Sequence, residues 1–371
     1  MRIGFDAKRA FRNTSGLGNH NRSTVTGLQT AFPDHEYVLY SPKTPTVRFD
    51  LAPFQVNYPQ GLSNISKSWW RSAGMTKDLV RDNIDVYHGL SHELPRGINK
   101  TNVKSVVTMH DVIFLRFPEL YKKIDVAVYT GKWKHACQVA DHIIAISEQT
   151  KTDLIELLQA EASKISVVYQ DCDQQFRMNV SEVEVEAVRK KYDLPDQLIL
   201  AIGTVEERKN ILTILKAMVH TSSKLSLVCL GKNTKYRDVL DEFIREQCLG
   251  NRVRFIDDAS FLDFPALYRT ARMLIYPSKF EGFGLPIIES MWSGTPVITT
   301  EGGVFSETGG DAAKYVKYDD VDAMVDAIDQ VNQDNELRTS MITKGMAHVQ
   351  KFKQEKGLEA VMNIYQRLVH G

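Results

Sequence analysis

Short apolar runs alternate with amphipathic segments along this 371-residue chain, and this alternation limits the folds open to it. In the first half, the runs that predict strands are residues 2–5, 37–40, 86–88, 105–109, 143–146 and 165–168. Helical patterns lie between them at residues 18–31, 69–83, 124–140 and 148–158. Strands that alternate with helices in this way predict an α/β fold with parallel sheets.

The same pattern restarts after a charged helical segment at residues 181–192. Strands are expected at residues 198–202, 225–230, 253–256, 273–276, 297–299 and 313–316, and helices at 211–220, 236–247, 264–270, 321–333 and 335–351. We therefore predict two Rossmann-like, doubly wound domains, residues 1–178 and 179–356, facing a central cleft. The last amphipathic helix, at about residues 357–371, can pack on either domain.

Composition narrows the class of protein. Basic and acidic residues balance at 46 each, so no nucleic-acid-binding surface is indicated. The four cysteines show no paired spacing, which argues against a disulfide framework or a zinc site. The N-terminus lacks the apolar run of a signal peptide, and no run of about 18 apolar residues exists. We therefore expect a cytoplasmic protein.

Two carboxylates, Glu281 and Glu289, flank a segment that contains Gly282, Gly284 and Pro286. A buried strand is predicted just before it, and Pro286 suits the first position of a helix. We expect Glu281 in the turn and Glu289 in the first turn of that helix. A helix N-terminus after a glycine turn binds anions, whereas carboxylates repel phosphate and suit hydroxyls. A ligand with phosphate and hydroxyl groups, such as a sugar nucleotide, meets both requirements.

Adjacent cations follow the predicted strand 198–202. Gly203 and Thr204 open this segment, and Arg208 and Lys209 lie just before the next predicted helix. Cations in that place can neutralise a diphosphate and stabilise it as a leaving group. The alternative is a solvated charge cluster in which they pair with Glu206 and Glu207.

His110 ends the predicted strand 105–109, where an imidazole can contact a sugar hydroxyl or transfer a proton. The alternative is a buried histidine bonded to Asp111. His88 and His92 can line the same cleft but have weaker claims. None of these histidines has metal-ligand spacing, so no metal is expected.

Glycines follow two further predicted strands. Gly16 and Gly18, in the segment Ser15–Gly18, can let backbone N–H groups approach a phosphate, or they can form a plain turn. A dinucleotide fingerprint would need a third glycine where the chain has Asn21, which argues against an NAD-binding protein. Gly302 and Gly303 can form a backbone nest for a phosphate or a hydroxyl, or an ordinary loop.

Trp69 and Trp70 lie next to basic residues. They can contact a membrane face or a lipid-linked acceptor. Packing in the core or the cleft is the commoner use of such side chains.

The segment from Tyr276 to Ile298, with its E-x7-E spacing of Glu281 and Glu289, resembles the signature of the family 4 retaining glycosyltransferases, which have the two-Rossmann GT-B fold. Other segments resemble the same family: the glycines of residues 15–18, the strand end Thr108–Asp111, residues 143–151, the sequence Gly203–Asn210 in a form seen in mannosyltransferase-like members, and Glu307 followed by residues 310–313. The chain departs from many members at Thr204, where they carry arginine, and at residues 170–173.

The resemblance implies a role for each matched residue. Glu289 would hold the nucleotide ribose, Glu281 and His110 would contact the transferred sugar, and Arg208 and Lys209 would bind the diphosphate. The remaining donor-binding candidates are backbone positions in the glycine-containing segments: Gly16, Gly18, Gly203, Thr204, Phe283, Gly284, Leu285, Gly302, Gly303 and Val304. It also implies that the C-terminal helix crosses back to an acceptor-binding first domain.

The predicted function is transfer of a hexose from a nucleoside diphosphate sugar, with retention and without a metal or other cofactor, to a saccharide or lipid-linked hydroxyl. The Thr204–Asn210 sequence favours GDP-mannose as the donor. Peripheral contact with the inner membrane face is compatible with this function, and the sequence does not indicate an oligomeric state. The alternatives are a nucleotide-sugar epimerase of the same fold, an NAD-dependent oxidoreductase and a non-catalytic sugar-nucleotide binder.

Overall fold

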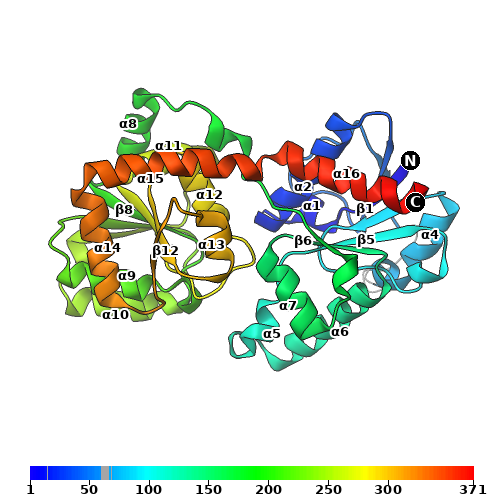
Figure 1. The fold of residues 1–371 in the computed structure, drawn as a ribbon, viewed down its shortest axis with the longest axis horizontal. Helices are drawn as coiled ribbons and strands as arrows, with labels where there is room; N and C mark the ends of the chain where they lie inside the picture. The colour runs from blue at the N-terminus through cyan, green and yellow to red at the C-terminus, as the bar shows by residue number, and fades with distance from the viewer. Residues whose placement is uncertain (15, 60–66, 68) are drawn as a thin grey trace. The chain divides into compact units, whose positions relative to one another are not determined.

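The computed structural model describes residues 1–14, 16–59, 67 and 69–371, so Ser15 of the first glycine segment lies outside the described residues. The chain forms two compact units (Figure 1). Unit 1 comprises Met1–Asp171 and Phe352–Gly371, and unit 2 comprises Cys172–Lys351. The predicted domains divide the chain slightly later, after residues 178 and 356.

Unit 1 contains a seven-stranded sheet in the order β3-β2-β1-β4-β5-β6-β7, with every neighbouring pair parallel. Its strands are β1 (Arg2–Asp6), β2 (Glu36–Tyr40), β3 (Gln55–Asn57), β4 (Val86–Gly89), β5 (Lys104–Met109), β6 (His142–Ala145) and β7 (Ile165–Val167). The chain runs outward from β1 to β3 and then returns to β4, on the other side of β1. The strand order therefore reverses between β1 and β4, which is where open α/β sheets bind ligands.

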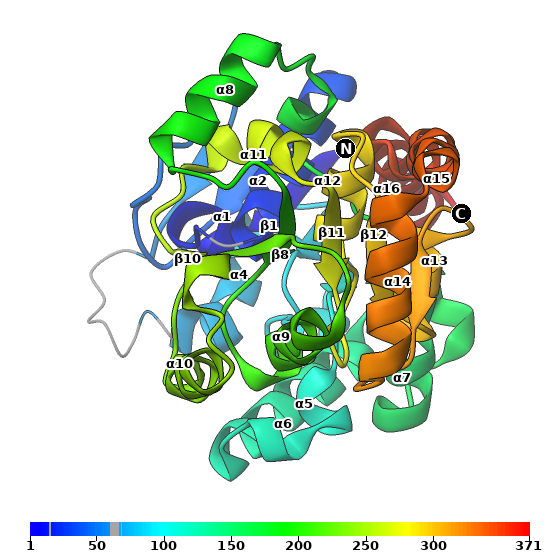
Figure 2. The same ribbon diagram turned by 90° about the vertical axis from the view of Figure 1, so that its left-hand side faces the viewer.

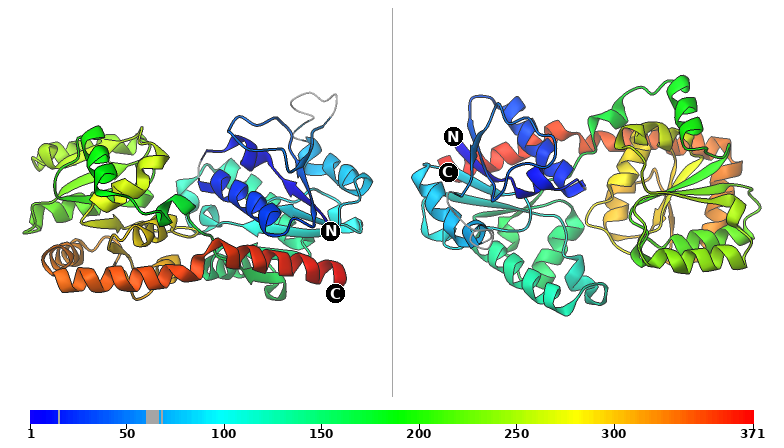
Figure 3. Two further views of the ribbon diagram at one scale, coloured as in Figure 1. Left: turned by 90° about the horizontal axis from the view of Figure 1, so that it is seen from above. Right: turned by 180° about the vertical axis from the view of Figure 1, so that it is seen from behind.

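The helices of unit 1 are α1 (Lys8–Arg12), α2 (Gly16–Ala31), α4 (Met75–Arg81), α5 (Ile113–Arg116), α6 (Lys123–Val139), α7 (Glu148–Leu158) and α16 (Gln354–His370). Helix α16 packs beside α2 on unit 1, and both chain termini lie on this unit (Figures 1 and 3). Its apolar face joins the core formed by Ile3, Phe5 and Leu28, where Tyr365 is fully buried. Burial of this amphipathic face accounts for the return of the chain to unit 1.

Unit 2 contains a six-stranded parallel sheet in the order β10-β9-β8-β11-β12-β13. Its strands are β8 (Leu198–Ile202), β9 (Ser226–Leu230), β10 (Val253–Ile256), β11 (Met273–Tyr276), β12 (Val297–Thr300) and β13 (Lys314–Val316). The strand order reverses between β8 and β11. These strands read as nearly continuous apolar runs because both faces of the sheet are covered.

The helices of unit 2 are α8 (Glu182–Lys191), α9 (Ile211–His220), α10 (Tyr236–Glu246), α11 (Phe264–Thr270), α12 (Leu285–Trp292), α13 (Gly303–Gly309), α14 (Val321–Gln333) and α15 (Asn335–His348). Helices α9 and α14 lie side by side (Figure 2), and their apolar residues share one core with β8, β9 and β11. The α/β prediction with two parallel sheets is confirmed. Within the described part of the chain, no helix combines the length and apolar composition that a membrane span needs.

Gly231, directly after β9, is a position where the fold requires glycine. Its φ is +148°, and an added Cβ would lie 2.1 Å from the carbonyl oxygen of Gly203. Gly231→Ala is therefore expected to lower the free energy of unfolding by about 3 kcal/mol or more, because backbone atoms would have to move. Denaturant unfolding measures this. Gly250→Ala is the matched control, since an added Cβ there meets nothing within 4 Å; equal loss in both variants would contradict the prediction.

Candidate functional site

The predicted donor-site residues of unit 2 gather at the carboxyl ends of β8 and β11, where the strand order reverses. Gly203 follows β8, with φ +131°, and its N–H donates to Leu230 O at 2.9 Å. An added Cβ at Gly203 would lie 2.9 Å from Cε of Lys209, so glycine leaves room for the lysine side chain. Lys279 N donates to Arg208 O at 2.8 Å, which ties the loop after β8 to the loop after β11.

Glu281 binds both predicted cations. Its Oε1 lies 2.7 Å from Nη1 of Arg208 and 2.5 Å from Nζ of Lys209, and all three side chains are at most 16% exposed. Arg208 also contacts Glu206 Oε1 at 2.7 Å and donates to Phe280 O at 2.6 Å. The sequence places Glu281 and the cations more than 70 residues apart in separate motifs, and the structure unites them in one cluster.

The charges in this cluster stabilise one another. Burial would raise the pKa of Glu281, but Lys209 and Arg208 outweigh it and lower the pKa to about 2. Burial is also the largest influence on Lys209, and it lowers the pKa of this amine. The hydroxyl of Tyr276 accepts a hydrogen bond from Lys209 at 2.8 Å, and Nζ lies 4.7 Å from the centre of the Tyr276 ring. The cluster therefore holds an ionised carboxylate beside two cations in a largely buried setting.

Glu289 lies on α12 in a separate, nearly buried environment. The hydroxyl of Tyr268 donates to its Oε2 at 2.7 Å. Burial raises the pKa of Glu289 to about 7, although the Tyr268 hydrogen bond opposes this. The predicted placement in the first helical turn is wrong: Gly284, with φ +117°, caps a helix that begins at Leu285, so Glu289 falls in the second turn. Glu281 and Glu289, the two carboxylates of the E-x7-E segment, therefore lie in different environments and differ chemically.

The remaining predicted residues of unit 2 lie at two helix starts. Phe283 is buried, and Gly284 and Leu285 form the N-terminus of α12. Gly302 and Gly303, for which a backbone nest or an ordinary loop was expected, lie at the start of α13: Gly302 caps this helix with φ +85°, Gly303 is its first residue, and Val304 is buried. Thr204, next to Gly203, is exposed. Helix α13 is short and contains glycine and apolar residues, so its sequence shows no clear helical period and does not predict a helix.

In unit 1, the His110 ring is buried and both of its nitrogens have protein partners. Nε2 donates to Leu90 O at 2.9 Å, which leaves Nδ1 to accept from the Gln170 amide at 2.9 Å. Burial lowers the pKa of His110 to about 4, so the ring is neutral near pH 7. No sequence pattern identifies Gln170 as the residue that fixes this tautomer.

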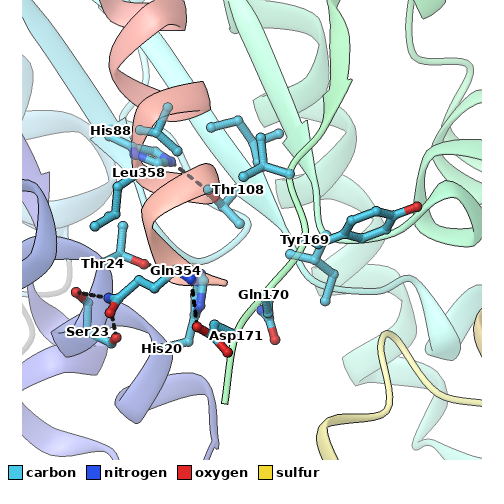
Figure 4. Close-up of a pocket in the computed structure, with 15 residues that line it drawn as sticks. His20, Ser23, Thr24, His88, Thr108, Tyr169, Gln170, Asp171, Gln354 and Leu358 are labelled. Atoms are coloured by element: carbon cyan, nitrogen blue, oxygen red, sulfur yellow. Dashed lines mark hydrogen bonds between the residues drawn. The ribbon is translucent and has the colours of Figure 1, made fainter. Parts of the chain in front are cut away.

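A small cavity of about 40 Å³, lined by polar and apolar side chains, lies in unit 1 between α2, α16 and the ends of β5 and β6. His88 bonds to Thr108 Oγ1 at 2.7 Å and to the Tyr365 hydroxyl at 2.6 Å. Gln354 bonds to Ser23 (Figure 4), while Tyr169 points away from this group. These hydrogen bonds join α16 to the sheet through His88 and to α2 through Ser23.

Among the other predicted residues of unit 1, Gly18 and Trp70 have packing roles, whereas Gly16 and Trp69 are exposed. An added Cβ at Gly18 would lie 2.0 Å from Asn13 O, so this glycine permits close approach of the chain, while Gly16 is exposed at the start of α2. Trp70 is buried and donates to Asp78 Oδ2 at 2.6 Å, whereas Trp69 is 63% exposed. In the described ranges, no group of three or more His, Cys, Asp or Glu side chains is arranged to hold a metal ion.

Comparison with known families matches both halves of the chain. Residues 184–348 match the family described as glycosyl transferases group 1, and residues 14–173 match glycosyltransferase family 4.

Individual proteins agree with these matches. O-antigen chain mannosyltransferase B of Escherichia coli is 30% identical over 78% of this chain and 76% of its own length. O-antigen chain mannosyltransferase RfbU of Salmonella typhimurium is 28% identical over 65% of this chain and 63% of its own length. The crystal structure of HepE of Anabaena in complex with UDP-glucose matches 99% of this chain and 100% of its own with a TM-score of 0.76 at 16% identity, which supports the GT-B fold.

Proposed function

The chain belongs to the group 1 glycosyltransferases and to glycosyltransferase family 4, and from that premise we propose that it transfers mannose from GDP-mannose to a saccharide hydroxyl. The reaction class, hexose transfer from a nucleoside diphosphate sugar, follows from the family. The observation that carries the assignment of the site is the contact of Glu281 with Arg208 and Lys209 at the strand reversal of unit 2. The matches do not favour the epimerase alternative.

In this proposal, Arg208 and Lys209 stabilise the charge of the departing diphosphate. Both cations already have carboxylate partners, so the donor phosphates must share them. Glu206 is 39% exposed and can turn into solvent, which frees the guanidinium of Arg208 for phosphate. The N-terminus of α12 supplies further N–H donors, and no metal is required.

Glu281 would remain beside Lys209 and contact the sugar near its anomeric carbon. As the carbon–oxygen bond to the diphosphate breaks, positive charge develops on the sugar, and an ionised carboxylate nearby stabilises it. The acceptor hydroxyl then attacks from the face that the diphosphate leaves, with a phosphate oxygen taking its proton. Both nitrogens of the neutral His110 ring have protein partners, so His110 would contact the sugar only by exchanging its hydrogen bond with Gln170 or Leu90.

Glu289 would accept hydrogen bonds from the ribose hydroxyls, and this predicts proton release on donor binding. Hydroxyl donors favour the carboxylate form, so binding should lower the Glu289 pKa from its value of about 7. At pH 7 about half a proton should be released per donor bound, and much less at pH 8.5. Titration calorimetry in buffers of different ionisation enthalpy measures this.

Glu289→Gln is the control for that measurement, since it cannot ionise. Because the folded-state pKa lies above the ordinary value, the wild type also loses stability as pH rises from 4.5 towards 7, and the glutamine variant should not. Equal proton release by both proteins would remove Glu289 from the ribose site.

A thermal-shift comparison of GDP-mannose, UDP-glucose and ADP-glucose tests the donor. Two relatives named as mannosyltransferases support GDP-mannose, whereas the HepE structure holds UDP-glucose. At 100 times its dissociation constant, the true donor stabilises the protein by about 2.7 kcal/mol. The largest rise in Tm with GDP-mannose would support the proposal, and a larger rise with UDP-glucose would overturn the choice of donor. An epimerase would form its product without an acceptor.

A further inference from the structure

A second charged site lies in unit 1, outside the residues assigned above. It is an open cavity of about 270 Å³ lined by Lys8, Arg12, Pro42, Lys43, Lys67, Arg71, Ser72 and Lys132. Six of these eight side chains are cationic. We call it the cationic pocket.

The topology of the sheet assembles the cationic pocket. Lys8 begins α1 just after β1, and Lys43 follows β2, the strand paired with β1. Asp6 at the end of β1 and Glu93 beyond β4 supply its carboxylates. The pocket thus lies at the carboxyl edge of the parallel sheet, next to the reversal between β1 and β4, where α/β sheets bind ligands.

The two carboxylates do not balance the cations. Arg71 is only 8% exposed and uses Nε on Asp6 at 3.0 Å and Nη1 on Glu93 at 2.7 Å. Lys132 Nζ shares Glu93 at 3.2 Å. Lys8, Arg12 and Lys43 form no ion pair with a carboxylate of the described residues. Burial, followed by the charge of Arg71, lowers the pKa of Lys8, so the pocket carries positive charge that a bound anion would relieve.

An exposed apolar surface adjoins the cationic pocket on helix α6. Ile124 is 70% exposed and Val128 is 48% exposed. Lys132 follows at the same four-residue spacing, so these three side chains lie along one face of the helix. A ligand with an anionic group at one end and an apolar chain beside it would satisfy both surfaces.

We propose that the cationic pocket binds the phosphate or diphosphate of a lipid-linked acceptor, with the first part of the lipid chain lying on Ile124 and Val128. This inference rests on the proposed function, because it identifies the acceptor of that reaction. Flexible lysines suit a phosphate-bearing group, which they bind as point charges, and Arg71 is held in place by Asp6 and Glu93.

Equilibrium binding to the full-length protein tests this, with GDP-mannose present at saturation to occupy unit 2. The probes are farnesyl diphosphate, inorganic diphosphate and farnesol. The wild type should bind farnesyl diphosphate most tightly. Lys8→Ala with Lys43→Ala should weaken it at least tenfold, and Lys100→Ala with Lys104→Ala, both exposed and outside the pocket, should not.

A further pair of variants separates the two surfaces. Ile124→Ser with Val128→Ser should weaken binding of farnesyl diphosphate and leave inorganic diphosphate unchanged. Unchanged binding of farnesyl diphosphate to the Lys8/Lys43 double variant would overturn the proposal. The proposal would also be overturned if the double variant lost binding only to phosphatidylglycerol vesicles, since the pocket would then bind a membrane headgroup.

Donor hydrolysis and donor binding distinguish a failure of this proposal from a failure of the proposed function. Hydrolysis of GDP-mannose without acceptor should be the same in the wild type and in the Lys8/Lys43 double variant. Failure of the proposed function appears as absent donor binding by the wild type. If the cationic pocket does not bind the acceptor, the Lys8/Lys43 double variant will bind farnesyl diphosphate as tightly as the wild type while it still binds and hydrolyses the donor normally.

Discussion

Glu281→Gln is expected to lower kcat for hexose transfer by about two to three orders of magnitude, the range seen when one electrostatic contact to a transition state is removed. Glutamine keeps an oxygen that can accept from Lys209 and Arg208, so the loop geometry should persist. It removes the negative charge, whose pKa of about 2 keeps it ionised at every practical pH. The loss should therefore fall on kcat more than on KM for the donor.

Steady-state kinetics with GDP-mannose, together with Tm and circular dichroism, measure this effect. Glu246→Gln is the matched control, since Glu246 is an exposed carboxylate at the end of α10 in the same unit. A folded Glu281→Gln protein with near-normal kcat would remove Glu281 from the reaction. If Glu281→Gln fails to fold, Glu281→Asp serves as a second variant. It restores the charge on a shorter side chain and should recover part of the stability but little of the rate.

Lys209→Met is the second large effect, and it should act on both donor binding and the departure of the diphosphate. Methionine has similar length, so the space left by Gly203 stays filled while the charge is lost. We expect kcat/KM for the donor to fall by about a hundredfold or more. Glu281 would keep only Arg208 as a cationic partner, so its pKa should rise from about 2.

The pH profile distinguishes this role from a purely structural one. In the wild type, activity should not fall on the acid side through titration of Glu281 in any accessible range. In Lys209→Met, an acid limb should enter the profile, because protonation of Glu281 now removes activity at higher pH. Lys224→Met, at an exposed lysine of unit 2, is the control. An unchanged donor KM and an unshifted profile in Lys209→Met would exclude the lysine from the site.

The sequence predicts the strands of both sheets well because parallel strands are buried on both faces and read as apolar runs. It misses the elements that have no such pattern. Strand β3 is a three-residue edge strand that is only partly buried. Helices α1, α5 and α13 have seven residues or fewer, which is too short for a clear helical period.

The sequence predicts the individual residues of the candidate site but not how they are arranged in space. Spacing places Arg208 and Glu281 after two different strands, and only the strand order β8-β11 brings those strands together. Tyr268 lies on a helix that carries no motif, and Gln170 lies in a segment that departs from the family pattern, so no sequence signal points to either as a partner. Burial raises the pKa of Glu289, whereas the charges of Lys209 and Arg208 outweigh burial and lower the pKa of Glu281. Two glutamates in one motif do not reveal that difference.

Retaining mannosyl transfer that depends on Glu281 can be tested by following the anomeric proton by NMR during reaction of GDP-mannose with a saccharide acceptor. We predict acceptor-dependent release of GDP and a new mannosyl linkage with the α configuration of the donor, lost in Glu281→Gln and kept in Glu246→Gln. A β-linked product, or equal transfer by Glu281→Gln, would contradict it.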